Sequence, residues 1–161
     1  MRRALPAAAV VLLCATAAHA QTPSRLPAGV YVITHVNEKP LPIADRLPTV
    51  NQMEQAVRLE EGVLRLRPDG RYVVAVRFHR ALVQRGAGMP STPVLDESSA
   101  GRFVLNGSNI TFIPDPKKRQ RTNPIAGQVR GPGKIQVPVV YRDANYERTY
   151  VFDLKFDPTR W

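Results

Sequence analysis

The sequence predicts an all-β protein in which eight antiparallel strands close into an up-and-down barrel. Between Leu64 and Phe156, apolar and polar residues alternate in short segments, and turn-forming residues separate these segments. Alternation with a period of two places every second side chain on the same face of a sheet. Here the large apolar residues fall on one continuous face. A sheet with such a face can bury it by closing on itself, which favours a barrel.

Eight segments carry this pattern. The predicted strands are residues 29–36, 57–67, 71–81, 100–105, 108–114, 126–131, 134–141 and 148–156. We expect a β-bulge at Glu60-Glu61-Gly62 in the second strand. Residues 43–55 are predicted to be a connection, within which Thr49 and Gln52 have the spacing that caps one helical turn.

The turns between these segments predict the strand register. Pro68-Asp69-Gly70 is typical of a three-residue hairpin loop, Asn106-Gly107 of a two-residue turn, and Gly131-Pro132-Gly133 of a third hairpin. The expected cross-strand pairs are Leu66 with Tyr72, Leu64 with Val74, Phe103 with Ile110, Val129 with Ile135, Tyr141 with Tyr150, Val139 with Phe152, Val137 with Leu154, and Ile135 with Phe156.

The predicted inward face contains all five phenylalanines of the chain. Its members are Leu64, Leu66, Tyr72, Val74, Val76, Phe78, Phe103, Leu105, Ile110, Phe112, Ile135, Val137, Val139, Tyr141, Tyr150, Phe152, Leu154 and Phe156. The residues expected to point outward are Arg65, Arg67, Arg71, Arg77, Arg102, Asp153 and Lys155.

The N-terminus has the pattern of a signal peptide. Arg2 and Arg3 precede an apolar stretch, and Ala18-His19-Ala20 forms a small-x-small cleavage site before Gln21. The apolar stretch is shorter than the roughly 20 residues that span a membrane. We therefore expect cleavage after Ala20, a flexible leader over residues 21–27, a barrel domain over residues 28–161, and a soluble protein in the periplasm or outside the cell.

The mature chain is basic and has no cysteine. Its 141 residues contain 21 Lys and Arg against 13 Asp and Glu, a net charge of +8. A basic secreted protein favours anionic envelope surfaces or proteins as partners, and nucleic acid is not expected outside the cell. A basic cluster is either a patch for an anionic surface or a solvated loop, and both interpretations stay open. The cluster is Lys117, Lys118, Arg119 and Arg121.

The sequence indicates neither catalysis nor a cofactor. His35 and His79, the histidines of the mature chain, have no second ligand at a metal-binding spacing. Adjacent strand residues point to opposite faces, so the pairs Glu60-Glu61 and Asp96-Glu97 do not converge as a general acid and base would. No serine lies in a nucleophile elbow. We expect a non-enzymatic protein without a cofactor or metal.

Several short patterns resemble a known family. They are Val36-Asn37-Glu38-Lys39-Pro40-Leu41-Pro42, Asp69-Gly70-Arg71-Tyr72, Ser99-Ala100-Gly101-Arg102-Phe103, Asn106-Gly107, and Thr149-Tyr150-Val151-Phe152. With these patterns the chain resembles the secreted bacterial lipocalin-like domain proteins, which are small barrels related in shape to the calycins. The resemblance implies the eight-stranded barrel. Barrels of this kind serve as ligand carriers and as enzyme inhibitors, so the resemblance does not choose a function.

Two functions follow as alternatives. In the first, the barrel holds a small apolar molecule, because eight strands enclose room for side chains or for one small ligand. The predicted lining is Tyr31, His35, Tyr72, Val74, Phe103, Phe112, Val139 and Phe152, with the connection 80–99 as a lid. In the second, the core is fully packed and the protein is an interaction module, for example an inhibitor of an envelope enzyme. It would then act through loops 80–99 and 114–124.

Overall fold

A computed structural model describes residues 26–48, 53–116, 123–143 and 146–160. These residues form ten strands and no helix, so the described ranges hold no helix that could cross a membrane. The strands are β1 (Gly29–Val36), β2 (Lys39–Pro40), β3 (Ile43–Pro48), β4 (Met53–Leu66), β5 (Arg71–Gln84), β6 (Leu95–Asn106), β7 (Asn109–Pro114), β8 (Ile125–Gly131), β9 (Lys134–Asp143) and β10 (Tyr146–Asp157).

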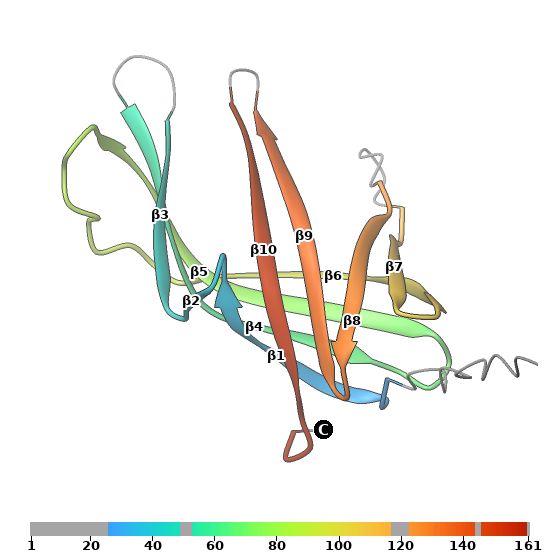
Figure 1. The fold of residues 1–161 in the computed structure, drawn as a ribbon. Coiled ribbons are helices and arrows are strands. Elements are labelled where there is room, and N and C mark those ends of the chain that lie inside the picture. Colours follow the sequence, from blue (N-terminus) through green and yellow to red (C-terminus); the bar gives the residue numbers. More distant parts are fainter. Residues whose placement is uncertain (1–25, 49–52, 117–122, 144–145, 161) are drawn as a thin grey trace, which may run out of the picture.

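Eight of the strands form a closed antiparallel barrel (Figure 1). From β4 to β10, each strand pairs with the next one in the sequence. β1 lies between β10 and β4 and pairs with both, which closes the sheet. The predicted up-and-down barrel is therefore confirmed, and each predicted strand corresponds to one strand of the barrel.

The connection predicted over residues 43–55 was wrong. Residues 43–48 form β3, which pairs with an extended β4 from Ile43 opposite Leu59 to Pro48 opposite Glu54. Apolar and polar residues alternate here as in the other strands, but prolines on either side hide the pattern. Proline is compatible with an edge strand, because its missing N–H need not meet a partner. The helical turn predicted at Thr49 and Gln52 lies outside the described residues.

Turn chemistry predicted part of the register correctly. Leu66 lies opposite Tyr72, and Val129 lies opposite Ile135. The pairing of β4 with β5 shifts between Leu59 and Glu61, so the predicted bulge is confirmed.

Two predicted hairpin registers were wrong, each by two residues. Phe103 faces Phe112 rather than Ile110, because the two-residue turn is Gly107-Ser108. Gly107 has φ +59°, the conformation that a type II′ turn requires at its first central position. In the last hairpin Tyr150 faces Val139. A shift of two residues keeps each side chain on its face, so the predicted faces survive the error.

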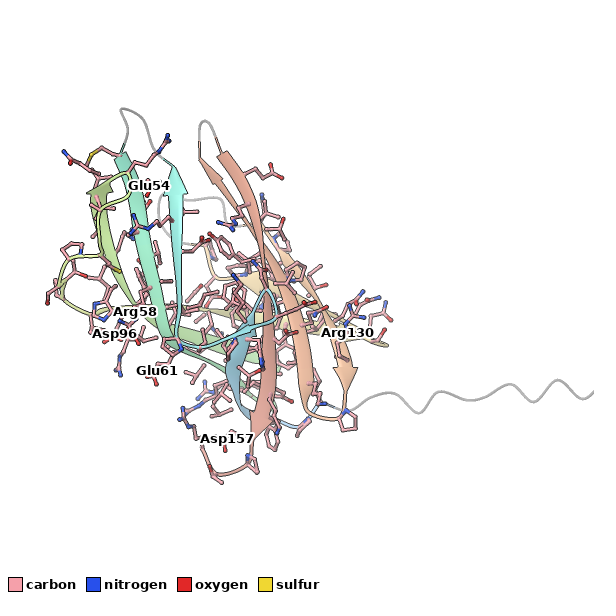
Figure 2. The ribbon with its side chains drawn as sticks, turned by 60° about the vertical axis from the view of Figure 1, so that its left-hand side comes forward. Glu54, Arg58, Glu61, Asp96, Arg130 and Asp157 are labelled. Carbon is pink, nitrogen blue, oxygen red and sulfur yellow. The ribbon has the colours of Figure 1, made fainter. Side chains whose placement is uncertain are left out.

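The predicted inward face forms the core. Its described members are either buried or are partly buried and packed against the core. Ile110 and Ile135 of this face, together with Tyr31 of β1, are among the most deeply buried side chains of the described residues. The side chain of Tyr141 lies outside the described set. Charged residues gather on the outside of β4, β5 and β6, where Figure 2 labels Arg58, Glu61 and Asp96.

The long connection after β5 is shorter than predicted. β5 continues to Gln84 and β6 begins at Leu95, so the loop covers residues 85–94 rather than 80–99. Thr92 accepts a hydrogen bond of 2.9 Å at its carbonyl from Nδ1 of His79, and the Arg46 guanidinium donates to the carbonyl of Ala87. These contacts hold the loop against the outer face of β3 and β5. In this structure the loop is therefore not a lid over the barrel interior.

Candidate ligand cavity

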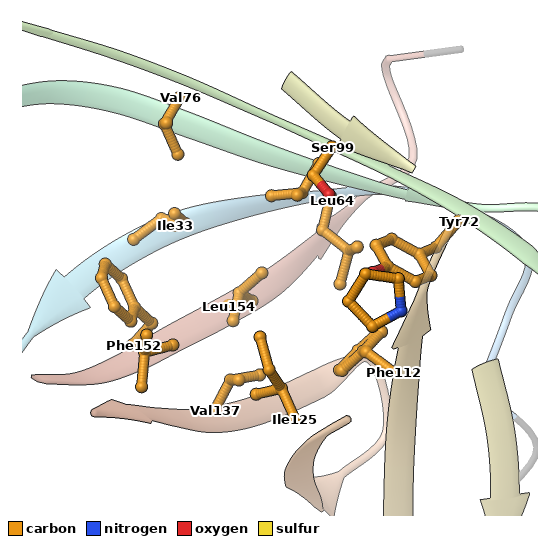
Figure 3. A pocket seen from close by; sticks show the side chains of 13 residues that line it. Ile33, Leu64, Tyr72, Val76, Ser99, Phe112, Ile125, Val137, Phe152 and Leu154 are labelled. Carbon is orange, nitrogen blue, oxygen red and sulfur yellow. The ribbon is translucent and has the colours of Figure 1, made fainter. Parts of the chain in front are cut away.

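An apolar cavity of about 230 Å³ lies inside the barrel. Figure 3 shows side chains from strands on opposite sides of the barrel converging on it. Its lining consists of Ile33, Leu64, Tyr72, Val74, Val76, Ser99, Phe112, Pro114, Ile125, Val137, Val139, Phe152 and Leu154. Four of these residues are valines, whose short side chains leave the centre of the barrel unfilled. We call this space the inner cavity.

Tyr72 and Ser99 supply the hydroxyl groups of the inner cavity. The Tyr72 ring packs edge-on against Phe112, with ring centroids 5.1 Å apart and an interplanar angle of 79°. Burial raises the pKa of Tyr72, so its phenol stays protonated. The inner cavity therefore presents hydroxyl groups and apolar surface, and no charge, among its lining residues.

A second cavity of about 250 Å³ lies next to the first, toward the β3 end of the barrel. Val76 and Phe152 belong to both linings, so the two spaces are neighbours along the barrel axis. The lining consists of Val36, Ile43, Asp45, Leu47, Gln55, Val57, Leu59, Val76, Phe78, Arg80, Glu97, Tyr150 and Phe152. We call this space the outer cavity. It combines an apolar wall with charged and amide side chains.

A hydrogen-bonded cluster joins β3 to β10 beside the outer cavity. Nη1 of Arg148 donates to both carboxylate oxygens of Asp45, at 2.8 and 2.7 Å. The Tyr150 hydroxyl donates to Oδ2 of the same carboxylate at 2.5 Å. The Arg148 guanidinium also lies 5.6 Å from the centroid of the Tyr150 ring. The cluster connects two strands that share no backbone pairing.

A second ion pair lies on the other side of the outer cavity. The Arg80 guanidinium lies 5.1 Å from the centroid of the Phe78 ring, and its Nη2 is 3.6 Å from Oε1 of Glu97. The described part of the mouth therefore has charges of both signs.

Tyr31 lies in the core rather than at the cavity. Its side chain is fully buried, its hydroxyl donates to the carbonyl of Pro27 at 2.8 Å, and its ring centroid lies 5.4 Å from that of Phe156. Burial raises the pKa of Tyr31 to about 12. Tyr31 and Phe156 together fill the end of the barrel opposite the outer cavity.

The inward position predicted for His35 was wrong. The register of β1 against β10 shifts between Ile33 and His35, which moves Val36 to the inner face and leaves His35 exposed. A bulge of one residue exchanges the faces of all residues beyond it, and nothing in the local sequence marked this bulge. His35 contacts the neighbouring Thr34 hydroxyl at 3.1 Å, outside the barrel.

Five of the eight predicted lining residues border the inner cavity, namely Tyr72, Val74, Phe112, Val139 and Phe152. Phe103 packs against the core but is not part of either lining. The polar residues of the outer cavity were missed. Arg80 and Glu97 do follow the alternation of the inward residues on their strands. Arg80 lies within the predicted strand 71–81 but beyond Phe78, the last residue assigned there to the inward face, and Glu97 precedes the predicted strand that begins at residue 100.

The predicted basic cluster Lys117, Lys118, Arg119 and Arg121 lies outside the described residues. Within the described ranges, no group of three or more His, Cys, Asp or Glu side chains is placed to hold a metal ion. Among the features that the structure describes, the pair of neighbouring cavities is thus the candidate site.

No protein-family model, curated protein or solved structure matches the chain, so the case for a binding site depends on the strand pairing and the cavity residues themselves.

Proposed function

We propose that this protein is a non-enzymatic binding protein of the periplasm or the cell exterior, and that it holds a small apolar or amphipathic molecule inside its barrel. The supporting observation is the pair of neighbouring cavities, apolar in the inner one and partly polar in the outer one. Ligand sites usually measure about 300–1,000 Å³. Each cavity alone is smaller than this range, and a ligand of ordinary size would have to occupy both by displacing the Val76 and Phe152 side chains that they share.

The inner cavity would supply most of the affinity. Its lining carries no charged group, so binding there draws on buried apolar area, at roughly 25 cal/mol per Å² before the costs of association. Binding of an uncharged apolar probe should therefore change little with salt concentration, because no ion pair is formed or broken.

A fluorescent apolar probe, N-phenyl-1-naphthylamine, tests the proposal directly. We expect the protein to take up the probe and the variant Val74→Trp to lose this uptake, because the larger ring would fill the inner cavity. Val73→Trp is the matched control. Val73 is the neighbouring residue on β5, points outward and is exposed, so this variant should bind the probe like the native protein.

The opposite result would rule out the inner cavity as a ligand-binding site. If the native protein takes up no probe, and Val74→Trp only lowers the free energy of unfolding by roughly 1–3 kcal/mol through overpacking, the interior is a packed core. Function would then have to lie in the surface loops, as in the interaction-module alternative.

A further inference from the structure

The charges at the mouth of the outer cavity are balanced. Among the described side chains, Asp45 and Glu97 contribute two negative charges, and Arg80 and Arg148 contribute two positive charges. Counted over these described side chains the charges cancel, although the chain as a whole has a net charge of +10. This local balance bears on which head group a bound molecule can carry.

Each arginine at the mouth already faces a carboxylate. Arg148 contacts both oxygens of Asp45, and the Asp45 carboxylate also accepts from the Tyr150 hydroxyl and from the backbone N–H of Arg46 at 2.9 Å. These four hydrogen bonds use the roughly four acceptor positions of a carboxylate. Arg80 lies between the Phe78 ring and Glu97. A ligand would therefore meet arginines that are already compensated.

This arrangement disfavours a charged head group. A carboxylate placed near Arg80 or Arg148 would also lie near Glu97 or Asp45, and the like charges would repel. An ammonium group placed near Glu97 or Asp45 would also lie near Arg80 or Arg148, and these positive charges would repel it. An uncharged head with hydroxyl or amide groups can instead hydrogen-bond to Gln55 or to Glu97 without separating either ion pair.

We propose that the bound molecule is a neutral amphiphile, with its apolar chain in the inner cavity and an uncharged hydroxyl- or amide-bearing head at the outer mouth. This inference rests on the proposed function and narrows its ligand class to neutral lipids of the acylglycerol or fatty-amide type. It also distinguishes the protein from a carrier of free fatty acids. In such a carrier we would expect an arginine without a neighbouring carboxylate to bind the carboxylate of the ligand.

Displacement of the fluorescent probe by three amphiphiles with equal chains tests the inference. The competitors are 1-lauroylglycerol, which is neutral, laurate, which is anionic, and a lauryl ammonium salt, which is cationic. At neutral pH and low salt, we expect lauroylglycerol to displace the probe at a concentration about tenfold lower than either charged competitor requires.

A pair of charge variants isolates the role of the mouth. Asp45→Asn combined with Glu97→Gln removes the carboxylates that pair with Arg148 and Arg80 at the mouth, so the preference should shift in favour of laurate. The matched control is Glu61→Gln combined with Asp96→Asn. These two carboxylates pair with Arg77 on the outer face, so the control removes the same charge and should keep the native preference. Glu97→Gln alone, at a side chain that is 63% exposed, should shift the preference partway if the double variant does not fold.

The outcomes are distinguishable. If native protein prefers laurate or the ammonium compound, or if the mouth variants and the outer-face variants behave alike, the neutral-ligand inference is overturned while probe uptake still supports a binding function. If the native protein takes up neither the probe nor any of the three amphiphiles, the proposed function fails and the inference fails with it.

Discussion

The two ends of the barrel are closed in different ways. At the end that contains Tyr31, β1 pairs through its backbone with β4 on one side and β10 on the other. At the end that contains the outer cavity, β1 has left β4 after Val32, and β3 and β10 are joined by the side chains of Asp45, Arg148 and Tyr150. Figure 1 shows β3 and the β9–β10 hairpin rising as separate arms at this end.

This difference predicts that the Tyr31 end is the more rigid end of the barrel and that the outer end opens more easily. Backbone pairing with a buried aromatic core responds little to salt, and it opens only when the strands separate. Side-chain contacts at half-exposed positions are weaker and are screened by salt. If the protein binds a ligand as proposed, we therefore expect the ligand to enter at the outer end.

The largest effect should come from crowding the backbone-paired wall. A Cβ atom at Gly101 would lie 2.2 Å from the carbonyl oxygen of Ile113 and 2.8 Å from Cα of Pro114, both backbone atoms of the neighbouring strand. We expect Gly101→Ala to lower the free energy of unfolding by about 3 kcal/mol, measured by urea unfolding. Gly88→Ala is the control, since no atom lies within 4 Å of the added carbon in that loop. Equal stability of the two variants would contradict the close contact in the wall.

Tyr31 should make the closed end sensitive to alkali. Its pKa is about 12 in the folded protein against 10.0 for a free phenol, so between these pH values the unfolded chain loses a proton that the folded chain keeps. Stability should therefore fall as pH rises through this window, by about 1 kcal/mol per pH unit. Tyr31→Phe should reduce this loss. It should also cost roughly 1 kcal/mol at neutral pH, because the hydrogen bond to Pro27 is gone. A pH dependence of unfolding that is the same in both proteins would contradict the assignment.

The smallest effect should be at the open end. A double-mutant cycle with Asp45→Ala and Arg148→Ala should give a coupling energy of about 1 kcal/mol at low salt, decreasing as salt is added. The exposed pair Arg71–Asp115 serves as a comparison and should give less than about 0.5 kcal/mol. If the coupling energy for Asp45–Arg148 is no larger than that for Arg71–Asp115, or does not change with salt concentration, this cluster does not hold β3 to β10.

Local pattern determined the strands and their faces. Alternation of apolar and polar residues depends only on neighbours two positions apart, so it identified the inward side chains even where the turn at Gly107 was assigned one residue too early. The strand β3 was missed because its alternation lies between prolines, which are stronger local signals of a connection.

The cavity could be predicted only in outline. The sequence alone placed Tyr72, Val74, Phe112, Val139 and Phe152 on the inner face, but it left open whether those side chains meet or enclose a space. That outcome depends on the summed volume of residues from strands far apart in the sequence.

Tertiary structure decided the features that depend on contacts between residues far apart in the sequence. The bulge that turns His35 outward, the pairing of β1 with β4 and the contact of Asp45 with Arg148 each depend on how the closed barrel brings distant segments together. Period-two alternation says which face a side chain occupies, and barrel closure decides which residue lies across from it. The sequence by itself thus determined the barrel and its apolar interior, while closure produced the polar mouth, because only a closed sheet brings β3 beside β10.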